Sequence, residues 1–312
     1  MNLPPRIAGL AGLLLALLST FSLSAAETTP LRFGLLPDAD SLPFLVADAE
    51  GLFAAQGLPV SLTIFKSPVE RDAAFQAGAV DGIVGDVLGA AFAVDNGFRV
   101  AITSQTDGRY GLVAGPATGI TSAAALAGQP IGTSTNTIIQ YFIDTALTRG
   151  GVAPAEIKYL AVPNMPMRLE MVLNGQIKAA GLPEPLLTVA RARGARLVAG
   201  SDSLTVAAGV VIFNKAYIDG HVADLARFYT AYAAAAQRIN ANNDAYRDFL
   251  VRKAGFPEEV RSAYQFVRYA GLRLPAPTEL EAVLAWLQGR KLLKTALVPS
   301  AMVDGRSLAG LP

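Results

Sequence analysis

The polar residues best placed to do chemistry in this chain lie where predicted strands give way to predicted helices. Asp86 closes the apolar stretch Gly82–Gly85, and the run Thr133–Thr137 brings four hydroxyls and one amide to a single helix start. The first N–H groups of a helix are unpaired and carry partial positive charge, so they hold polar ligands well. One cap uses only one side chain. The surplus in Thr133–Thr137 and the charge of Asp86 therefore point to ligand contacts.

The other strand-to-helix junctions are explained by helix capping as readily as by binding. Ser67, with Pro68 and Glu70 after it, forms a capping box with proline at the first helical position. Three more residues suit a simple N-cap: Ser41, Asn164 and Glu184. Four basic residues are either partners for an anion or solvated charges: Lys66, Arg71, Arg109 and Arg168.

Catalytic motifs are missing from the sequence. It contains no G-x-S-x-G, G-x-x-x-x-G-K-[ST] or G-x-G-x-x-G, no cysteine, and a single histidine, His221. Thiol catalysis, disulfides and any site that needs two histidines are therefore excluded. The carboxyl pair Asp38 and Asp40 suits acid–base work, but no residue nearby supplies a nucleophile with its base. We expect a protein that is not an enzyme and needs no metal or cofactor.

The amino-acid composition excludes further classes of protein. The chain has 312 residues, which favours about two domains, and it is 52% hydrophobic and 16% charged, which excludes intrinsic disorder. Its 26 Lys and Arg residues nearly balance its 25 Asp and Glu residues, whereas a nucleic-acid-binding protein normally has a basic excess. We therefore expect a small-molecule partner and no nucleic acid.

Residues 1–26 have the features of a cleaved secretory signal. Arg6 is the only charge before Glu27, the run Ile7–Leu18 is almost wholly apolar, and Ser24–Ala26 supplies small residues for cleavage. The apolar run is short for a membrane span, which needs about 20 residues. No cysteine follows it, so the protein is not predicted to be a lipoprotein. The sequence predicts export to the periplasm.

After the signal, short apolar strands alternate with helices, a pattern typical of an α/β protein with mostly parallel sheets. The rhythm runs from Leu31 to Thr103 and begins again at Pro130. Four identities are repeated 97 residues apart, Gly78 with Gly175 among them, which favours two similarly built lobes. After Phe213 the pattern is helical, and its predicted helices are 222–239, 245–254, 258–269 and 278–287.

The junctions resemble those of the bacterial periplasmic solute-binding proteins for sulfonate, nitrate and taurine. The superfamily also contains binders of the thiamin pyrimidine precursor. The resemblance lies in five segments: Pro43–Phe65, Ala74–Asp81 followed by Gly85–Asp86, Ile131–Ser134, Arg168–Gly175 and Glu184–Pro185.

This resemblance implies a two-lobed periplasmic-binding-protein fold (type II), in which each lobe is a mostly parallel sheet flanked by helices. Two crossing strands would join the lobes, with residues 27–114 plus 207–312 in the first lobe and 115–206 in the second. Carried over by position, the ligand contacts in the cleft are Ser41, Ser67, Asp86, Ser134, Thr135, Asn136, Asn164 and Glu184. Asp86 and Glu184 would repel a simple anion, so a zwitterion or an aminopyrimidine suits them better.

The resemblance also implies a partner, an inner-membrane ABC permease with its ATPase, and a monomeric binding protein. The ligand is then a small nitrogen- or sulfur-containing organic solute. Two alternatives stay open on the sequence alone: a ligand-sensing subunit that presents its closed lobes to a membrane receptor, and an exported enzyme that uses carboxylates and hydroxyls.

Overall fold

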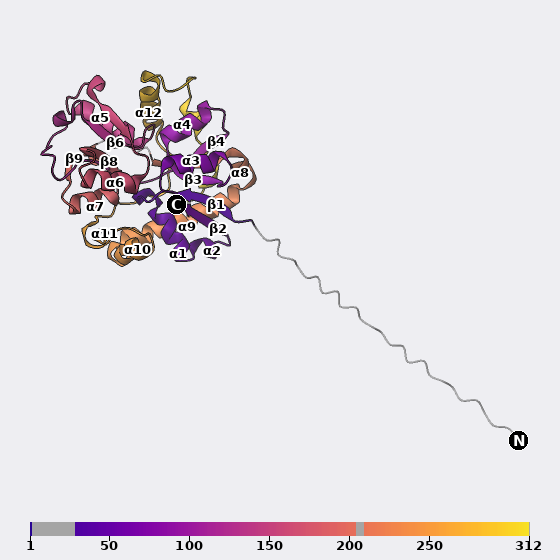
Figure 1. Ribbon diagram of the computed structural model, residues 1–312. Coiled ribbons are helices and arrows are strands. Elements are labelled where there is room, and N and C mark those ends of the chain that lie inside the picture. Colours follow the sequence, from indigo (N-terminus) through magenta and orange to yellow (C-terminus); the bar gives the residue numbers. More distant parts are fainter. Residues whose placement is uncertain (2–28, 204–208, 312) are drawn as a thin grey trace.

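A computed structural model describes Met1 and residues 29–203 and 209–311, and it places the chain in two lobes with one sheet each (Figure 1). The predicted signal peptide, residues 1–26, lies outside the described residues apart from Met1. None of the described helices is long and apolar enough to cross a membrane.

The first sheet has the strand order β2-β1-β3-β10-β4. β1 runs parallel to β2 and β3, whereas β10 is antiparallel to both of its neighbours. Because β10 comes from the second half of the chain, the first lobe is completed only by that late strand. The strands are β1 (Leu31–Leu35), β2 (Val60–Ile64), β3 (Gly82–Asp86), β4 (Val100–Gln105) and β10 (Gly209–Asn214).

The second sheet repeats this arrangement in the order β7-β6-β8-β5-β9. Its antiparallel strand is β5, which pairs with β8 and β9. The sequence placed β5 in the first lobe. The predicted lobe boundary after residue 114 is wrong, because Tyr110–Ala114 pairs with β8 and β9 and with no described strand of the first sheet. The strands are β5 (Tyr110–Ala114), β6 (Pro130–Thr133), β7 (Lys158–Ala161), β8 (Ala179–Pro183) and β9 (Arg196–Gly200).

Helices flank both sheets, as the alternating sequence pattern predicts. The first lobe carries α1 (Leu42–Ala49), α2 (Leu52–Ala55), α3 (Pro68–Gln76) and α4 (Val87–Asp95), and the second carries α5 (Ile138–Arg149), α6 (Met165–Leu173) and α7 (Leu186–Ala192). After β10 the chain is helical, with α8 (Lys215–Gly220), α9 (Val222–Ala241), α10 (Arg247–Arg252), α11 (Glu259–Ala263) and α12 (Pro277–Gly289).

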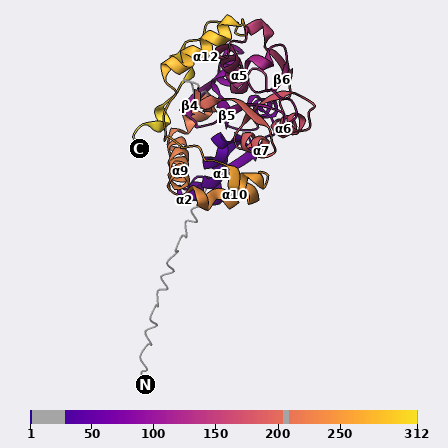
Figure 2. The same cartoon turned by 90° about the vertical axis from the view of Figure 1, so that its left-hand side faces the viewer.

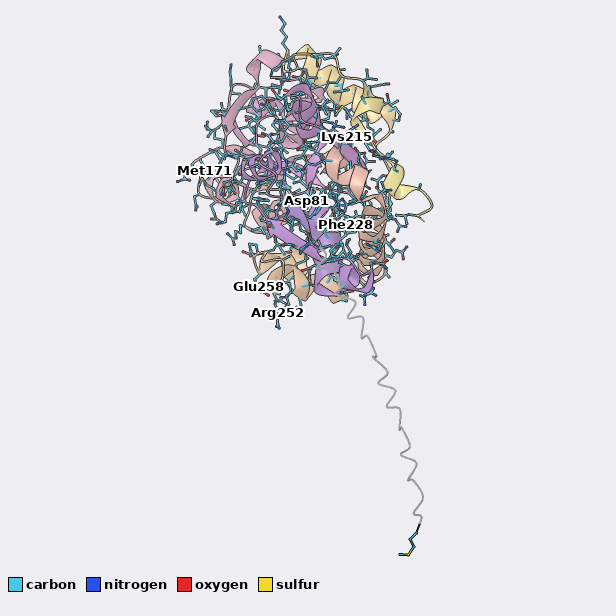
Figure 3. All side chains as sticks on the ribbon, turned by 90° about the vertical axis from the view of Figure 1, so that its right-hand side faces the viewer. Asp81, Met171, Lys215, Phe228, Arg252 and Glu258 are labelled. Atoms are coloured by element: carbon cyan, nitrogen blue, oxygen red, sulfur yellow. The ribbon has the colours of Figure 1, made fainter. Side chains whose placement is uncertain are left out.

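The core of the first lobe contains a cluster of aromatic rings. Phe33 lies 5.0 Å from Phe44 and 4.9 Å from Phe228, measured between ring centroids. Figure 3 marks Phe228, which α9 brings against the sheet. Phe213 stacks on Phe33 and covers Gly82, where an added Cβ would lie 2.4 Å from the ring. Burying such rings supplies much of the apolar area that holds α9 to the sheet.

The C-terminal helices touch both lobes (Figure 2). α9 packs on α1 and α2, whereas α11 packs on α7, where Arg193 pairs with Glu259 at 2.7 Å. α12 packs on α4, and its Trp286 donates from Nε1 to Asp144 of α5 at 2.7 Å. The sequence analysis assigned these C-terminal helices to the first lobe, but they also pack against the second lobe.

The predicted helix 258–269 is wrong in its second half, because the helix ends at Ala263. The guanidinium of Arg247 donates to the carbonyl oxygens of Arg261 and Tyr264 and so satisfies the last turn. Tyr264, Val267 and Tyr269 are buried from an extended segment.

Candidate functional site

The ends of the strands in the two lobes face each other across a small cavity of about 30 Å³. This volume holds one or two water molecules, so the lobes are closed on one another. The first lobe lines the cavity with Asp38, Asp40, Arg71 and Asp86, and the second lobe lines it with Ser134, Thr137, Ile138 and Met165.

Around this cavity, three main-chain N–H groups donate hydrogen bonds to the opposite lobe. The N–H of Ala39 donates to the carbonyl oxygen of Glu184 at 2.8 Å, and that of Met165 donates to the carbonyl oxygen of Lys66 at 3.2 Å. The third uses a side chain: the N–H of Ile138 donates to Oδ2 of Asp86 at 3.2 Å.

Asp86 joins the starts of two helices from opposite lobes. Its Oδ1 accepts from the N–H of Gly89 at 2.8 Å and caps α4, while its Oδ2 takes the bond from Ile138, the first residue of α5. Burial raises the pKa of this carboxyl, and the Arg71 guanidinium opposes that shift. The sequence analysis predicts a ligand contact for Asp86, and in this structure its second oxygen contacts the other lobe.

Asp38 and Asp40 stand beside Asp86 at the turn before α1. Oδ1 of Asp38 accepts from the N–H of Ser41 at 3.1 Å and from its hydroxyl at 2.9 Å. Oδ2 of Asp38 accepts no hydrogen bond from any described residue. Burial and the charge of Asp40 raise the pKa of Asp38, and burial raises the pKa of Asp40 to about 6. The wall of the first lobe therefore holds three buried carboxyls.

Asp40 also lies where the chain crosses between the lobes. Its Oδ1 accepts from the hydroxyl of Thr106 at 2.6 Å and its Oδ2 from that of Tyr110 at 3.1 Å. A Cβ on Gly108 would lie 2.1 Å from Oδ2, and one on Gly209 would lie 2.6 Å from Oδ1. The backbones of both crossing segments therefore approach this carboxyl so closely that only glycine fits.

Each lobe has one buried arginine near the cavity, and the two differ in their partners. Arg71 donates from Nε to Asp72 at 2.8 Å and from Nη1 to the carbonyl oxygen of Val84 at 3.0 Å. The charges of Asp72, Asp86 and Asp38 favour its protonated form. Arg71 thus compensates part of the negative charge in the first lobe.

Arg168 is fully buried without any carboxylate partner among the described residues. Its Nη1 donates at 2.7 Å to Oγ of Ser134 and to the carbonyl oxygen of Val162, while Nε and Nη2 have no hydrogen-bond partner there. Burial lowers the pKa of Arg168 to about 9. Because Oγ of Ser134 accepts from Arg168, its own proton is free to be donated into the cavity.

Of the eight side chains expected to contact a ligand, Asp86 and Ser134 line the cavity. Ser41 supports Asp38, Ser67 and Asn164 cap α3 and α6, and Thr135 and Asn136 are exposed. Glu184 lines a different cavity beside α7, where its Oε2 accepts from the N–H and the hydroxyl of Thr188.

Several residues around the cavity were not among those eight. Asp38 and Asp40 were noticed only as a carboxyl pair, Arg71 and Arg168 only as possible anion partners, and Tyr110 only as a wall residue. One signal was present in the sequence: Arg71 and Arg168 are 97 residues apart, the same spacing as the repeated glycines. Within residues 29–203 and 209–311, no cluster of three or more acidic or histidine side chains is arranged to hold a metal ion.

Comparison with solved structures identifies this architecture. The alkanesulfonate-binding protein SsuA from Xanthomonas axonopodis pv. citri, bound to MOPS, superimposes with a TM-score of 0.78 at 16% identity, covering 90% of this chain and 100% of that one. The ligand-binding component of an ABC-type import system from Staphylococcus aureus gives 0.80 at 12% identity, covering 91% and 99%. The desulfurization enzyme DSZB gives 0.65 at 16% identity, covering 90% and 98%.

No curated protein sequence matches the chain. The model of the NMT1-like family matches residues 24–251, which is well over half of the chain. The two sheets with their exchanged antiparallel strands form the two-lobed α/β fold of periplasmic binding proteins. The chain therefore belongs to the NMT1-like family.

Proposed function

We propose that this protein is the periplasmic substrate-binding component of an ABC importer. It binds a small nitrogen- or sulfur-containing organic solute between its lobes and delivers it to an inner-membrane permease with its ATPase. The observation that carries this proposal is the meeting of two polar walls across the closed cleft, with Asp86 bonded to the first N–H of α5. A site built at helix starts between two lobes binds and releases its ligand by hinge motion.

Closure follows from the contacts that span the cleft. Opening would break the bonds to Asp86, to the carbonyl oxygen of Glu184 and to that of Lys66, while Thr106 and Tyr110 keep the crossing segment tied to Asp40. A ligand enters the open form and restores a closed form with the solute inside. The closed form is the one that the permease recognises in this proposal.

The proposal includes export and a monomeric protein in the periplasm. The charge and hydropathy pattern of residues 1–26 supports export. The Staphylococcus aureus neighbour is the ligand-binding component of an ABC-type import system, which supports an importer as the partner.

A second candidate is an exported enzyme, because DSZB has the same fold and is named an enzyme. The carboxyls here are bonded to helix starts and to the hydroxyls of Thr106 and Tyr110. Of the hydroxyls in the cavity lining, that of Thr137 donates to the carbonyl oxygen of Ser134, and that of Ser134 accepts from Arg168. Mass spectrometry of the solute recovered from the protein separates the two functions. A binding protein returns the solute unchanged, whereas an enzyme returns a product.

Thermal unfolding of the mature protein against a solute panel tests the binding function. The panel contains taurine, alkanesulfonates, nitrate, thiamin and its pyrimidine precursor, riboflavin and amino acids. A ligand at 100 times its dissociation constant stabilises the folded state by about 2.7 kcal/mol, which raises the midpoint by several degrees. Asp86→Ala and Ser134→Ala should weaken the response, whereas Asp48→Ala, at an exposed position on α1, should not. Unchanged affinity in both cleft variants would refute the site.

A further inference from the structure

We propose that the cleft recognises its ligand through a positively charged group and rejects free anions such as sulfonate and nitrate, because Asp86 already supplies the anion at the start of α5. The inference rests on the proposed binding function and names the chemical class of the solute. A protonated amine or amidine meets this requirement, either alone or within a zwitterion.

The start of α5 is occupied by a group of the protein itself. α5 has 12 residues, and the N–H of its first residue, Ile138, donates to Oδ2 of Asp86 at 3.2 Å. An anion from solution would have to displace this carboxylate, which is covalently held at the site by β3. It would also lie beside the negative charge that it displaced, and such like-charge contacts disfavour binding.

The described cavity lining holds more carboxyl groups than cations. Asp38, Asp40 and Asp86 are 7%, 3% and 3% exposed, and the single cation in the lining, Arg71, also pairs with Asp72. Buried charges require compensation, which a cationic ligand group supplies when the cleft closes.

One oxygen in the cavity is left without a donor. Oδ2 of Asp38 accepts no hydrogen bond from the described residues, although its side chain is more than nine-tenths buried and lines the cavity. Its other oxygen is held by Ser41, so the carboxyl is fixed in orientation. An ammonium or amidinium N–H that donates to Oδ2 would complete this group.

The second-lobe wall of the cavity offers a hydrogen-bond donor, which requires an acceptor atom in the ligand. Arg168 donates to Oγ of Ser134, which orients the Ser134 hydroxyl as a donor, and Arg168 itself is not among the residues that line the cavity. Arg168 acts here as a positioning residue. The ligand therefore has a cationic donor facing the first lobe and an acceptor facing the second.

A matched set of small molecules separates charge from size. Ethylamine, ethanesulfonate and taurine carry the amine, the sulfonate and both groups on two carbons, and benzamidine and benzenesulfonate repeat the contrast on a ring. Thermal unfolding is measured with the mature wild-type protein. Amine-bearing and amidine-bearing compounds should raise the midpoint by several degrees, and the two simple sulfonates should leave it unchanged.

Two variants test the role of Asp86. Asp86→Asn keeps a side-chain cap for α4 and removes the charge, so the dissociation constant for ethanesulfonate should fall at least tenfold. The matched control is Asp48→Asn, on the exposed face of α1, which should bind as the wild type does. The ligand-free midpoint and circular dichroism of each variant show that it is folded.

The possible outcomes are distinct. A wild-type midpoint that rises with ethanesulfonate or benzenesulfonate as much as with the amines overturns the cationic class and leaves the binding function standing. A folded Asp86→Asn protein that gains no sulfonate affinity also overturns it. No shift with any of the five compounds contradicts the inference, and the wider solute panel then decides whether the proposed binding function stands.

Discussion

Arg71 and Arg168 occupy equivalent positions in the two lobes but have opposite electrostatic surroundings. Each is the fourth residue after the N-cap of a nine-residue helix, α3 or α6, and each donates from Nη1 to a carbonyl oxygen of the adjoining sheet region. Arg71 has carboxylates around it, whereas Arg168 has none among the residues that the structure describes, and burial lowers the pKa of Arg168 to about 9.

The comparison distinguishes what the lobes share, their backbone arrangement, from what differs between them, the side chains that face the cavity. The two lobes share strand order, and α3 and α6 each have nine residues and a side-chain N-cap, Ser67 or Asn164. What differs is the chemistry of the facing walls: carboxyls on one side, and hydroxyls backed by a guanidinium on the other. Two lobes with the same strand order can therefore present opposite walls of different chemistry through only a few side chains.

The largest expected effect comes from removing each arginine in turn. Arg71→Met leaves Asp38 and Asp86 buried without their cation, and should lower the free energy of unfolding by about 3–5 kcal/mol. Arg168→Met removes a buried charge that has no carboxylate partner, and should change the stability by no more than about 1 kcal/mol. Urea unfolding of both variants measures the difference. Equal losses would show that the two environments do not differ as described.

The second expected effect is a pH dependence of the free energy of unfolding, which arises from Asp40 in the first lobe. The pKa of Asp40 is raised to about 6, so the folded state binds this proton more tightly than the unfolded state. Its stabilising contribution is complete below pH 4 and is lost as the pH rises through 6. The upper limit is about 3 kcal/mol. In urea unfolding from pH 4 to pH 7, the stability advantage of wild type over Asp40→Asn should shrink. A constant difference would contradict the assignment.

A third effect distinguishes the two ends of the hinge. Gly108→Ala places a Cβ against the Asp40 carboxyl and the Tyr110 hydroxyl, and should destabilise the protein by about 1–3 kcal/mol. Gly200→Ala, at the end of β9, meets no atom within 4 Å and should change stability by less than about 0.5 kcal/mol. Thermal unfolding compares them. If both were neutral, the crossing segments would have to be looser around Asp40 than described.

The smallest effect should be the same in both lobes. Ser67→Ala and Asn164→Ala each remove one N-cap, whose acceptor lies 3.2 Å or 2.9 Å from the capped N–H. Each should cost about 1 kcal/mol in the free energy of unfolding. Ligand affinity measured on the same variants tells whether either cap is also a contact. A loss of affinity larger than the loss of stability would restore these residues to the site.

Much of the fold can be predicted from the sequence because local sequence patterns determine the helices and strands. The alternation of apolar runs with capped helices predicts both lobes, and the buried strand Gly82–Asp86 ends at the residue that closes the cleft. The sequence does not predict to which sheet β5 belongs, because five apolar residues between the two halves could pair equally well with either sheet. Long-range pairing decides such a case.

The site is harder to predict, because capping and binding use the same residue types. Ser67 is a cap and Asp86 is both cap and interlobe contact, yet both follow a strand and precede a helix. The role of Asp40 depends on Gly108 and Gly209, which are far away in the sequence. That Arg168 has no carboxylate partner is likewise a property of the folded chain alone.

The place of β10 in the middle of the first sheet has a consequence for how the chain matures. The second sheet is contained within residues 110–200, whereas the first cannot close until Gly209–Asn214 arrives between β3 and β4. During synthesis or export from the N-terminus, the lobe that begins first is thus finished last. Until then β3 and β4 present open edges, and such edges are where unfinished chains pair wrongly with one another.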